Sequence, residues 1–231
     1  MSFDDEYDWG RDEYEMEIAN RAIEEFQTER LQSFYKDHRE LALKPIHLGK
    51  EARLVLEESP SAALVLATAS IEVGFKSIIL RPIISGLVHE ESLASLVTEV
   101  FVKSAKQDGV LKIVYQVLKK YASIDLQQMT LPQHNKPYWM EITEAQELRN
   151  GVLHRAEACS KQDAERVIEL AEYLWNAIFL DVIKSLGLHT HDNQRICEHH
   201  ETICASRAMM EKIRQSGELS LADRVRLAIN K

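Results

Sequence analysis

The stretch SPSAALVLATASIEVGFKSIIL, residues 59 to 80, decides the fold. Ser59 and Pro60 are typical of a helix start, with serine as the N-cap and proline in the first helical position. The residues that follow are apolar on nearly every side of a helix, which indicates a buried central helix. Because Glu72 and Lys76 interrupt the run, its uncharged part is too short to span a bilayer. We therefore predict the core helix of a protein that is not membrane-embedded.

The chain on both sides of this stretch also has a helical pattern. Glycine and proline are few, and no segment alternates between polar and apolar residues as a half-buried strand does. The pattern predicts helices over residues 12–38, Pro45 to about 58, 91–105, 110–121, 143–155, 160–186, 195–216 and 220–229, with a break or a change of direction at Pro82 and a stop at Gly187. We expect an all-α protein with an acidic tail and leading helix (1–44), a helical bundle (45–187) and a C-terminal helical appendage (188–231).

Composition limits the classes of function. The net charge of −9 does not favour a surface that binds nucleic acid over its whole area, so any such binding requires a local basic patch. Only three cysteines are present, which favours a reducing compartment over a disulfide framework. The acidic start lacks the basic and apolar regions of a signal peptide. We therefore expect a cytoplasmic protein.

The stretch ELRNGVLHRAE, residues 147 to 157, holds the candidate catalytic residues. Thr143 to Gln146 resembles a capping box that starts the helix carrying it. At about 100° per residue, Asn150 and His154 share one face while Arg149 borders the apolar arc, and Arg149 lies about 7.5 Å from His154 along the axis. One helix therefore does not direct both side chains at one small target. A second copy related by a two-fold axis would bring them together.

The chemistry of these three side chains suits cleavage of a phosphodiester by its neighbouring 2′-hydroxyl. His154 can take or return a proton near neutral pH, Arg149 can stabilise charge on the phosphorane, and Asn150 can position the substrate. This chemistry requires no metal and no cofactor. The spacing alone favours a structural role, in which Arg149 pairs with a carboxylate and His154 is partly exposed.

The stretch LRNGVLHR resembles the R-(polar)-x3-H signature of the HEPN superfamily, many of whose members are ribonucleases of toxin and antiviral systems. Arg149, Asn150 and His154 match its arginine, polar position and histidine. The run from Ser59 to Ile79 resembles the other recurrent helix of the superfamily, with Glu72 at its acidic position. The resemblance covers about residues 45 to 186.

The resemblance implies a helical bundle that dimerises with the two motifs facing each other. It also implies metal-independent cleavage of RNA that leaves a 2′,3′-cyclic phosphate. One position departs from some family toxins, which carry a tyrosine two residues beyond the histidine that a partner enzyme modifies. This chain has Ala156 there, so that mode of control is not expected.

Several other residues allow two interpretations. Glu72 and Lys76 can form a local ion pair, or Glu72 can lie near the motif and orient Arg149 or His154. Tyr138 and Trp139 can stack on bases or anchor a loop in the core. A basic patch is expected around the motif helix and its flanking loops, formed by His134, Lys136, Arg149, Arg155 and Lys161.

The C-terminal stretch HTHDNQRICEHHETIC is rich in histidine and cysteine. Cys197, His200 and Cys204 fall at i, i+3 and i+7, which places them on one face if the segment is a helix. His189, His191 and His199 lie close in sequence. The residues can form a zinc site, although the spacing is not that of a common zinc finger. Alternatively, the cysteines are small apolar residues of a helix turned inward.

Together these features predict an endoribonuclease of the HEPN type, with RNA as substrate and a site shared across a homodimer. A toxin or antiviral defence role is expected, with an antitoxin or regulatory protein as a possible partner. The alternative is a non-catalytic helical dimer that serves as a scaffold or antitoxin-like binding module.

Overall fold

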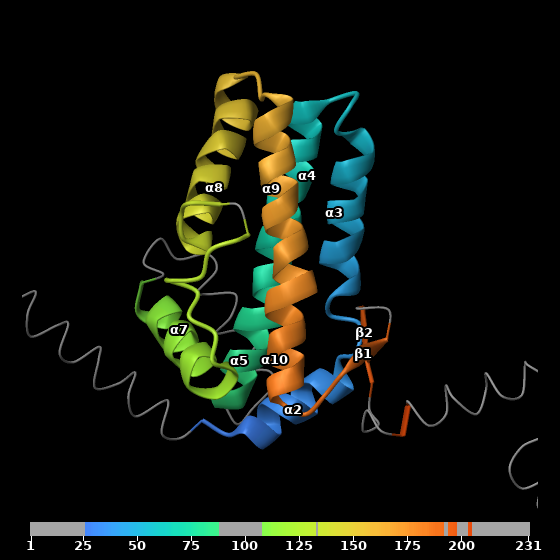
Figure 1. Cartoon of the computed structure of the whole chain (residues 1–231), viewed down its shortest axis with the longest axis vertical. Helices are drawn as coiled ribbons and strands as arrows, with labels where there is room; N and C mark the ends of the chain where they lie inside the picture. Colours follow the sequence, from blue (N-terminus) through green and yellow to red (C-terminus); the bar gives the residue numbers. More distant parts are fainter. Residues whose placement is uncertain (1–25, 88–107, 133, 192–193, 198–202, 205–231) are drawn as a thin grey trace, which may run out of the picture.

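The computed structural model describes residues 26–87, 108–132, 134–191, 194–197 and 203–204. These residues form a helical bundle with one short β-hairpin, which confirms the predicted all-α class (Figure 1). In chain order the elements are α2 (Thr28–Asp37), α3 (Leu43–Val55), α4 (Pro60–Gly74), η1 (Phe75–Leu80, π-helical), α5 (Arg81–Leu87), α7 (Asp108–Ala122), α8 (Tyr138–Arg155), α9 (Lys161–Tyr173), η2 (Leu174–Ile178, π-helical), α10 (Phe179–Ser185), β1 (Thr190–His191) and β2 (Arg195–Ile196). The predicted helices at 91–105 and 220–229, and the first half of 12–38, lie outside the described residues.

Two long helical rods form the centre of the bundle. The first runs from α4 through η1 to α5 and the second from α9 through η2 to α10, with α3 and α8 beside them (Figure 1). Their contact faces are fully buried and apolar, with Ala63, Leu64, Ala67, Val167, Ile168, Leu170 and Ala171 all inaccessible to solvent. The first rod, Pro60–Leu87, is long and apolar enough to cross a membrane, but 56% of its apolar window is buried inside the protein. It is the core helix that the sequence predicted.

Two glycines allow close approach between the rods and their neighbours. A Cβ at Gly74 would lie 2.7 Å from a methyl carbon of Leu174, where the two π-helical turns adjoin. A Cβ at Gly49 of α3 would lie 2.1 Å from the ring of Trp175. Such separations are too short for carbon atoms, so a side chain at either position would force the Leu174 side chain or the Trp175 ring to move.

Local signals set most of the helix ends. The Ser59 hydroxyl accepts a hydrogen bond from the Ala62 N–H, and the Ser160 hydroxyl accepts one from the Asp163 N–H at 3.1 Å. Both predicted helix starts are therefore confirmed. Gly187 has a φ of +67° just after the second rod, as expected of a glycine that ends a helix.

The predicted capping box at Thr143 is wrong. Helix α8 begins at Tyr138, and Thr143 lies inside it, where its hydroxyl donates to the Trp139 carbonyl at 3.1 Å. The reason is tertiary: Tyr138 is buried, and its hydroxyl donates to the Leu170 carbonyl of α9 at 3.1 Å. This contact fixes the start of the helix earlier than the local signal indicated.

Of the break or change of direction predicted at Pro82, the break is wrong, because the helical rod continues through α5 to Leu87. Proline has no N–H for the carbonyl four residues earlier, which here belongs to Ile78. The Tyr35 hydroxyl of α2 donates to that carbonyl at 2.5 Å and replaces the missing donor. A π-helical turn directly before α5 adjusts the backbone, as is common where a helix ladder is interrupted.

The described part of the C-terminal appendage is a hairpin with a short helical stretch at Ile203 and Cys204. Strands β1 and β2 are antiparallel, with Thr190 opposite Ile196. The predicted helix from 195 is therefore wrong at its start, because Arg195–Ile196 is a strand. Ile196 is buried, and its N–H donates to the Arg39 carbonyl at 3.0 Å, so the hairpin packs on the connection between α2 and α3.

Candidate functional site

Glu72 and Arg149, far apart in sequence, meet at the contact between α4 and α8. A guanidinium nitrogen of Arg149 donates to a carboxylate oxygen of Glu72, and the two side chains are 26% and 40% exposed. The partner of Glu72 is thus a residue of the motif helix, as one of the two interpretations predicted. Because a guanidinium carries five N–H donors, this bond orients Arg149 and leaves most of its donors for other contacts.

The other two motif residues lie nearer to solvent. Asn150 is half-buried, while His154 is exposed in the last turn of α8. The helix ends directly after it, at Ala156 in the left-handed conformation with a φ of +53°, and the N–H groups of Ala156 and Glu157 both donate to the Gly151 carbonyl. The motif therefore occupies the rim at one end of the bundle. This placement fits both the catalytic and the structural interpretation of the motif.

The expected basic patch is not an open positive surface. Each of its five side chains pairs with a carboxylate: His134 with Glu141, Lys136 with Glu144, Arg149 with Glu72, Arg155 with Glu157 and Lys161 with Glu57. The hydrogen bond that Arg155 donates lowers the pKa of Glu157, and the hydrogen bond that Lys161 donates to Glu57 raises the pKa of Lys161, so both pairs stay ionised at neutral pH. The prediction failed because it counted basic residues without their acidic partners from neighbouring turns and helices.

The two aromatic residues at the start of α8 are core anchors. Tyr138 is 1% exposed. Trp139 packs between Phe75 and Tyr115, with ring centroids 5.4 Å and 5.6 Å away. Tyr138 is therefore closed to stacking on a base, and the half-buried Trp139 packs against the core, as the structural interpretation predicted.

A pocket of about 440 Å³ at the other end of α8 holds a group that the sequence did not reveal. His134 lies there between two carboxylates, with Nδ1 2.8 Å from Glu141 and Nε2 3.3 Å from Glu169. Glu141 is 2% exposed, and its burial is tolerated because the imidazole is its partner. The three residues come from a loop, α8 and α9, so no local pattern could have indicated that they meet.

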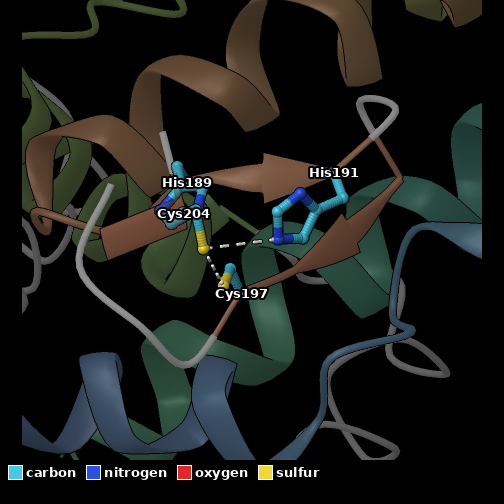
Figure 2. A group of neighbouring side chains, drawn as sticks. All are labelled: His189, His191, Cys197 and Cys204. Carbon is cyan, nitrogen blue, oxygen red and sulfur yellow. Dashed lines mark hydrogen bonds between the residues drawn. The ribbon is translucent and has the colours of Figure 1, made fainter. Parts of the chain in front are cut away.

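The C-terminal cysteines do meet, although not as the sequence predicted. Cys197 follows strand β2 and Cys204 lies in the short helical stretch, so they do not share one helix, yet their sulfurs are 3.3 Å apart. His200 lies outside the described residues. The other members of the cluster are His189 and His191 (Figure 2).

Comparison of the chain with protein-family models, with curated proteins and with solved structures finds no match in any of the three.

Proposed function

We propose that the chain is a metal-independent endoribonuclease of the HEPN type. The observation that supports this most is the bond between Glu72 and Arg149. It joins the two segments on which the resemblance rests, and it does so at the acidic position and the motif arginine. A local pair between Glu72 and Lys76 would not have joined the acidic position to the motif arginine.

Each motif residue has a role in the proposed reaction. His154 removes the proton from a 2′-hydroxyl, whose oxygen then bonds to the adjacent phosphorus while the bond from phosphorus to the 5′-oxygen breaks. The protonated imidazole returns the proton to the departing 5′-oxygen, leaving a 2′,3′-cyclic phosphate. Arg149 stabilises the charge on the phosphorane, Asn150 positions the phosphate, and Glu72 is a positioning residue for Arg149.

The site is proposed to be shared between two copies of the chain. His154 is five positions after Arg149, about 7.5 Å along the axis of α8, so a guanidinium from one copy and an imidazole from the other reach one phosphate more easily. Leu153, beside His154, is 52% exposed and offers an apolar contact for the second copy. We further propose a cytoplasmic role as a toxin or antiviral effector, restrained by a partner protein.

The test is cleavage of total RNA by the purified chain in EDTA, which suppresses metal-dependent contaminants. We expect products that end in a cyclic phosphate, and loss of cleavage in His154→Ala with the dimer intact. His47→Ala is the matched control, because His47 is also an exposed helical histidine, 72% exposed on α3. Cleavage that persists in His154→Ala would refute the assignment.

A second candidate is a non-catalytic binding module. The carboxylate partners of the five basic side chains around the motif favour it, because they leave little net positive charge to hold RNA. This candidate predicts a chain that leaves RNA intact and co-purifies with a protein partner. The same assay therefore separates the two.

A further inference from the structure

The hairpin at the C-terminal end brings four metal-binding side chains to one place. His189 immediately precedes β1, His191 ends it, and Cys197 immediately follows β2. The Cys197 N–H donates to the His189 carbonyl at 2.9 Å, so these two residues lie opposite each other. Because side chains alternate along strands, all three project from the same face of the hairpin. Cys204 approaches this face from the short helical stretch (Figure 2).

The distances between the donor atoms match a tetrahedral ion. Four atoms, one from each residue, all lie within 4.8 Å of one another. The Cys204 sulfur lies 3.7 Å from Nε2 of His191 and 3.3 Å from the Cys197 sulfur. Zn–S bonds of about 2.3 Å and Zn–N bonds of about 2.0–2.1 Å in a regular tetrahedron separate the donors by about 3.3–3.8 Å. Only small side-chain adjustments are needed to surround an ion.

We propose that His189, His191, Cys197 and Cys204 bind one structural zinc ion. Two sulfur and two nitrogen donors favour zinc over calcium or magnesium, which prefer oxygen. Two thiolates neutralise the charge of Zn²⁺, which suits a site where Cys197 is buried. The separation of the sulfurs is well beyond a disulfide bond of about 2.05 Å, so the described arrangement is that of two thiols.

Four protein ligands leave no position for water or substrate, so this zinc has no part in catalysis. Its role is to join the segment around Cys204 to the hairpin. The hairpin is in turn held on the bundle by the Arg195–Glu40 ion pair and by the bond from the Ile196 N–H to Arg39. The zinc thus attaches the C-terminal segment to the connection between α2 and α3.

The zinc site and the motif lie at opposite ends of the bundle. Helix α8 ends beside the start of α9 at the top of Figure 1, while β1 and β2 lie near α2 at the bottom. The zinc inference therefore does not depend on the nuclease proposal. Loss of zinc is expected to leave the contact between Glu72 and Arg149 intact, and His154→Ala is expected to leave the zinc in place.

The test is elemental analysis of the full chain, purified with a reductant and without added metal. We expect about one equivalent of zinc per chain, falling to near zero in Cys204→Ser. Cys159→Ser is the matched control and is expected to retain the full amount, because Cys159 lies at the start of α9, away from the hairpin. Zinc retained in Cys204→Ser, or absent from the wild-type chain even after incubation with zinc chloride, would overturn the proposal.

A second measurement uses the wild-type chain, so its result does not depend on whether Cys204→Ser folds. Cobalt replacing the zinc should give the intense visible absorption of a tetrahedral site and a sulfur-to-cobalt charge-transfer band. In alkylation followed by peptide mass spectrometry, Cys197 and Cys204 should react much faster after chelation of the metal, while the rate at Cys159 stays the same. Equal rates at Cys197 and Cys204 with and without chelator, or a Cys197–Cys204 disulfide in place of the metal, would contradict the site.

Discussion

Replacing Tyr35 by phenylalanine tests how the central rod passes through Pro82. The Tyr35 side chain is 0% exposed, and its hydroxyl donates to the Ile78 carbonyl at 2.5 Å. Burial raises the pKa of Tyr35, so the hydroxyl keeps its proton and remains a donor at neutral pH. Phenylalanine keeps the ring and removes only this donor. The same rod carries Glu72, so its continuity matters for the candidate site.

The expected cost follows from the carbonyl that loses its partner. A buried polar group without a hydrogen bond costs about 1–3 kcal/mol, and Pro82 supplies no N–H as a substitute. We therefore expect the free energy of unfolding, measured by urea denaturation, to fall by about 1–3 kcal/mol in Tyr35→Phe. Tyr173→Phe is the control, because Tyr173 is only half-buried, and it should change the stability by less than about 0.5 kcal/mol.

A double-mutant cycle makes this prediction specific. In Pro82→Ala the restored N–H can donate to the freed carbonyl, so adding Tyr35→Phe should cost clearly less than it does beside proline. If Tyr35→Phe lowers the stability equally in the wild-type chain and in Pro82→Ala, or has no effect in the wild-type chain, the idea that Tyr35 replaces the missing donor is refuted.

Two further predictions concern the surface. Lys136→Met removes the hydrogen bond that is the main cause of the lowered pKa of Glu144. The pKa of Glu144 in the folded protein lies below its ordinary value of 4.5. The ion pair with Lys136 therefore stabilises the protein fully above pH 4.5, and this stabilisation is lost as the pH falls through the folded pKa. Urea denaturation should thus show a loss of less than about 1 kcal/mol at pH 7 that becomes smaller as the pH falls below 4.5. A loss that stays the same as the pH falls until Glu144 is protonated would contradict this prediction. Leu153→Glu should shift the proposed dimer to monomer in analytical sedimentation. Leu54→Glu is the control and should not, because Leu54 is 80% exposed on a different helix, α3. A dimer that is unaffected by Leu153→Glu would exclude an interface at Leu153.

The helix ends show which parts of the fold the sequence could predict. Ser59, Ser160 and Gly187 act within one turn of their own position, and the structure agrees with each. The predictions of a helix break at Pro82 and a helix start at Thr143 were wrong because contacts with residues far away in the sequence determine the local structure at both positions. The Tyr35 hydroxyl repairs the ladder at Pro82, and the packing of Tyr138 on α9 starts α8 before Thr143.

The two candidate sites also differ in how much of each could be predicted from the sequence. The contact between Glu72 and Arg149 was one of two alternatives for Glu72, the other being a local pair with Lys76. A zinc site in the C-terminal stretch was also one of two alternatives, but the particular set of His189, His191, Cys197 and Cys204 was not predicted, because the register of a hairpin brings these residues together and helical spacing misassigned Cys197. A short hairpin with little alternation gives a weak signal, whereas the histidines and cysteines were visible from composition.

The most direct test of the shared site is complementation between two inactive variants. Arg149→Ala retains His154, and His154→Ala retains Arg149, so a mixed dimer holds one of each on different chains. After subunit exchange verified by native mass spectrometry, we expect the mixture to cleave RNA although neither variant does so alone. A mixture with verified mixed dimers that remains inactive would contradict a site built from both copies.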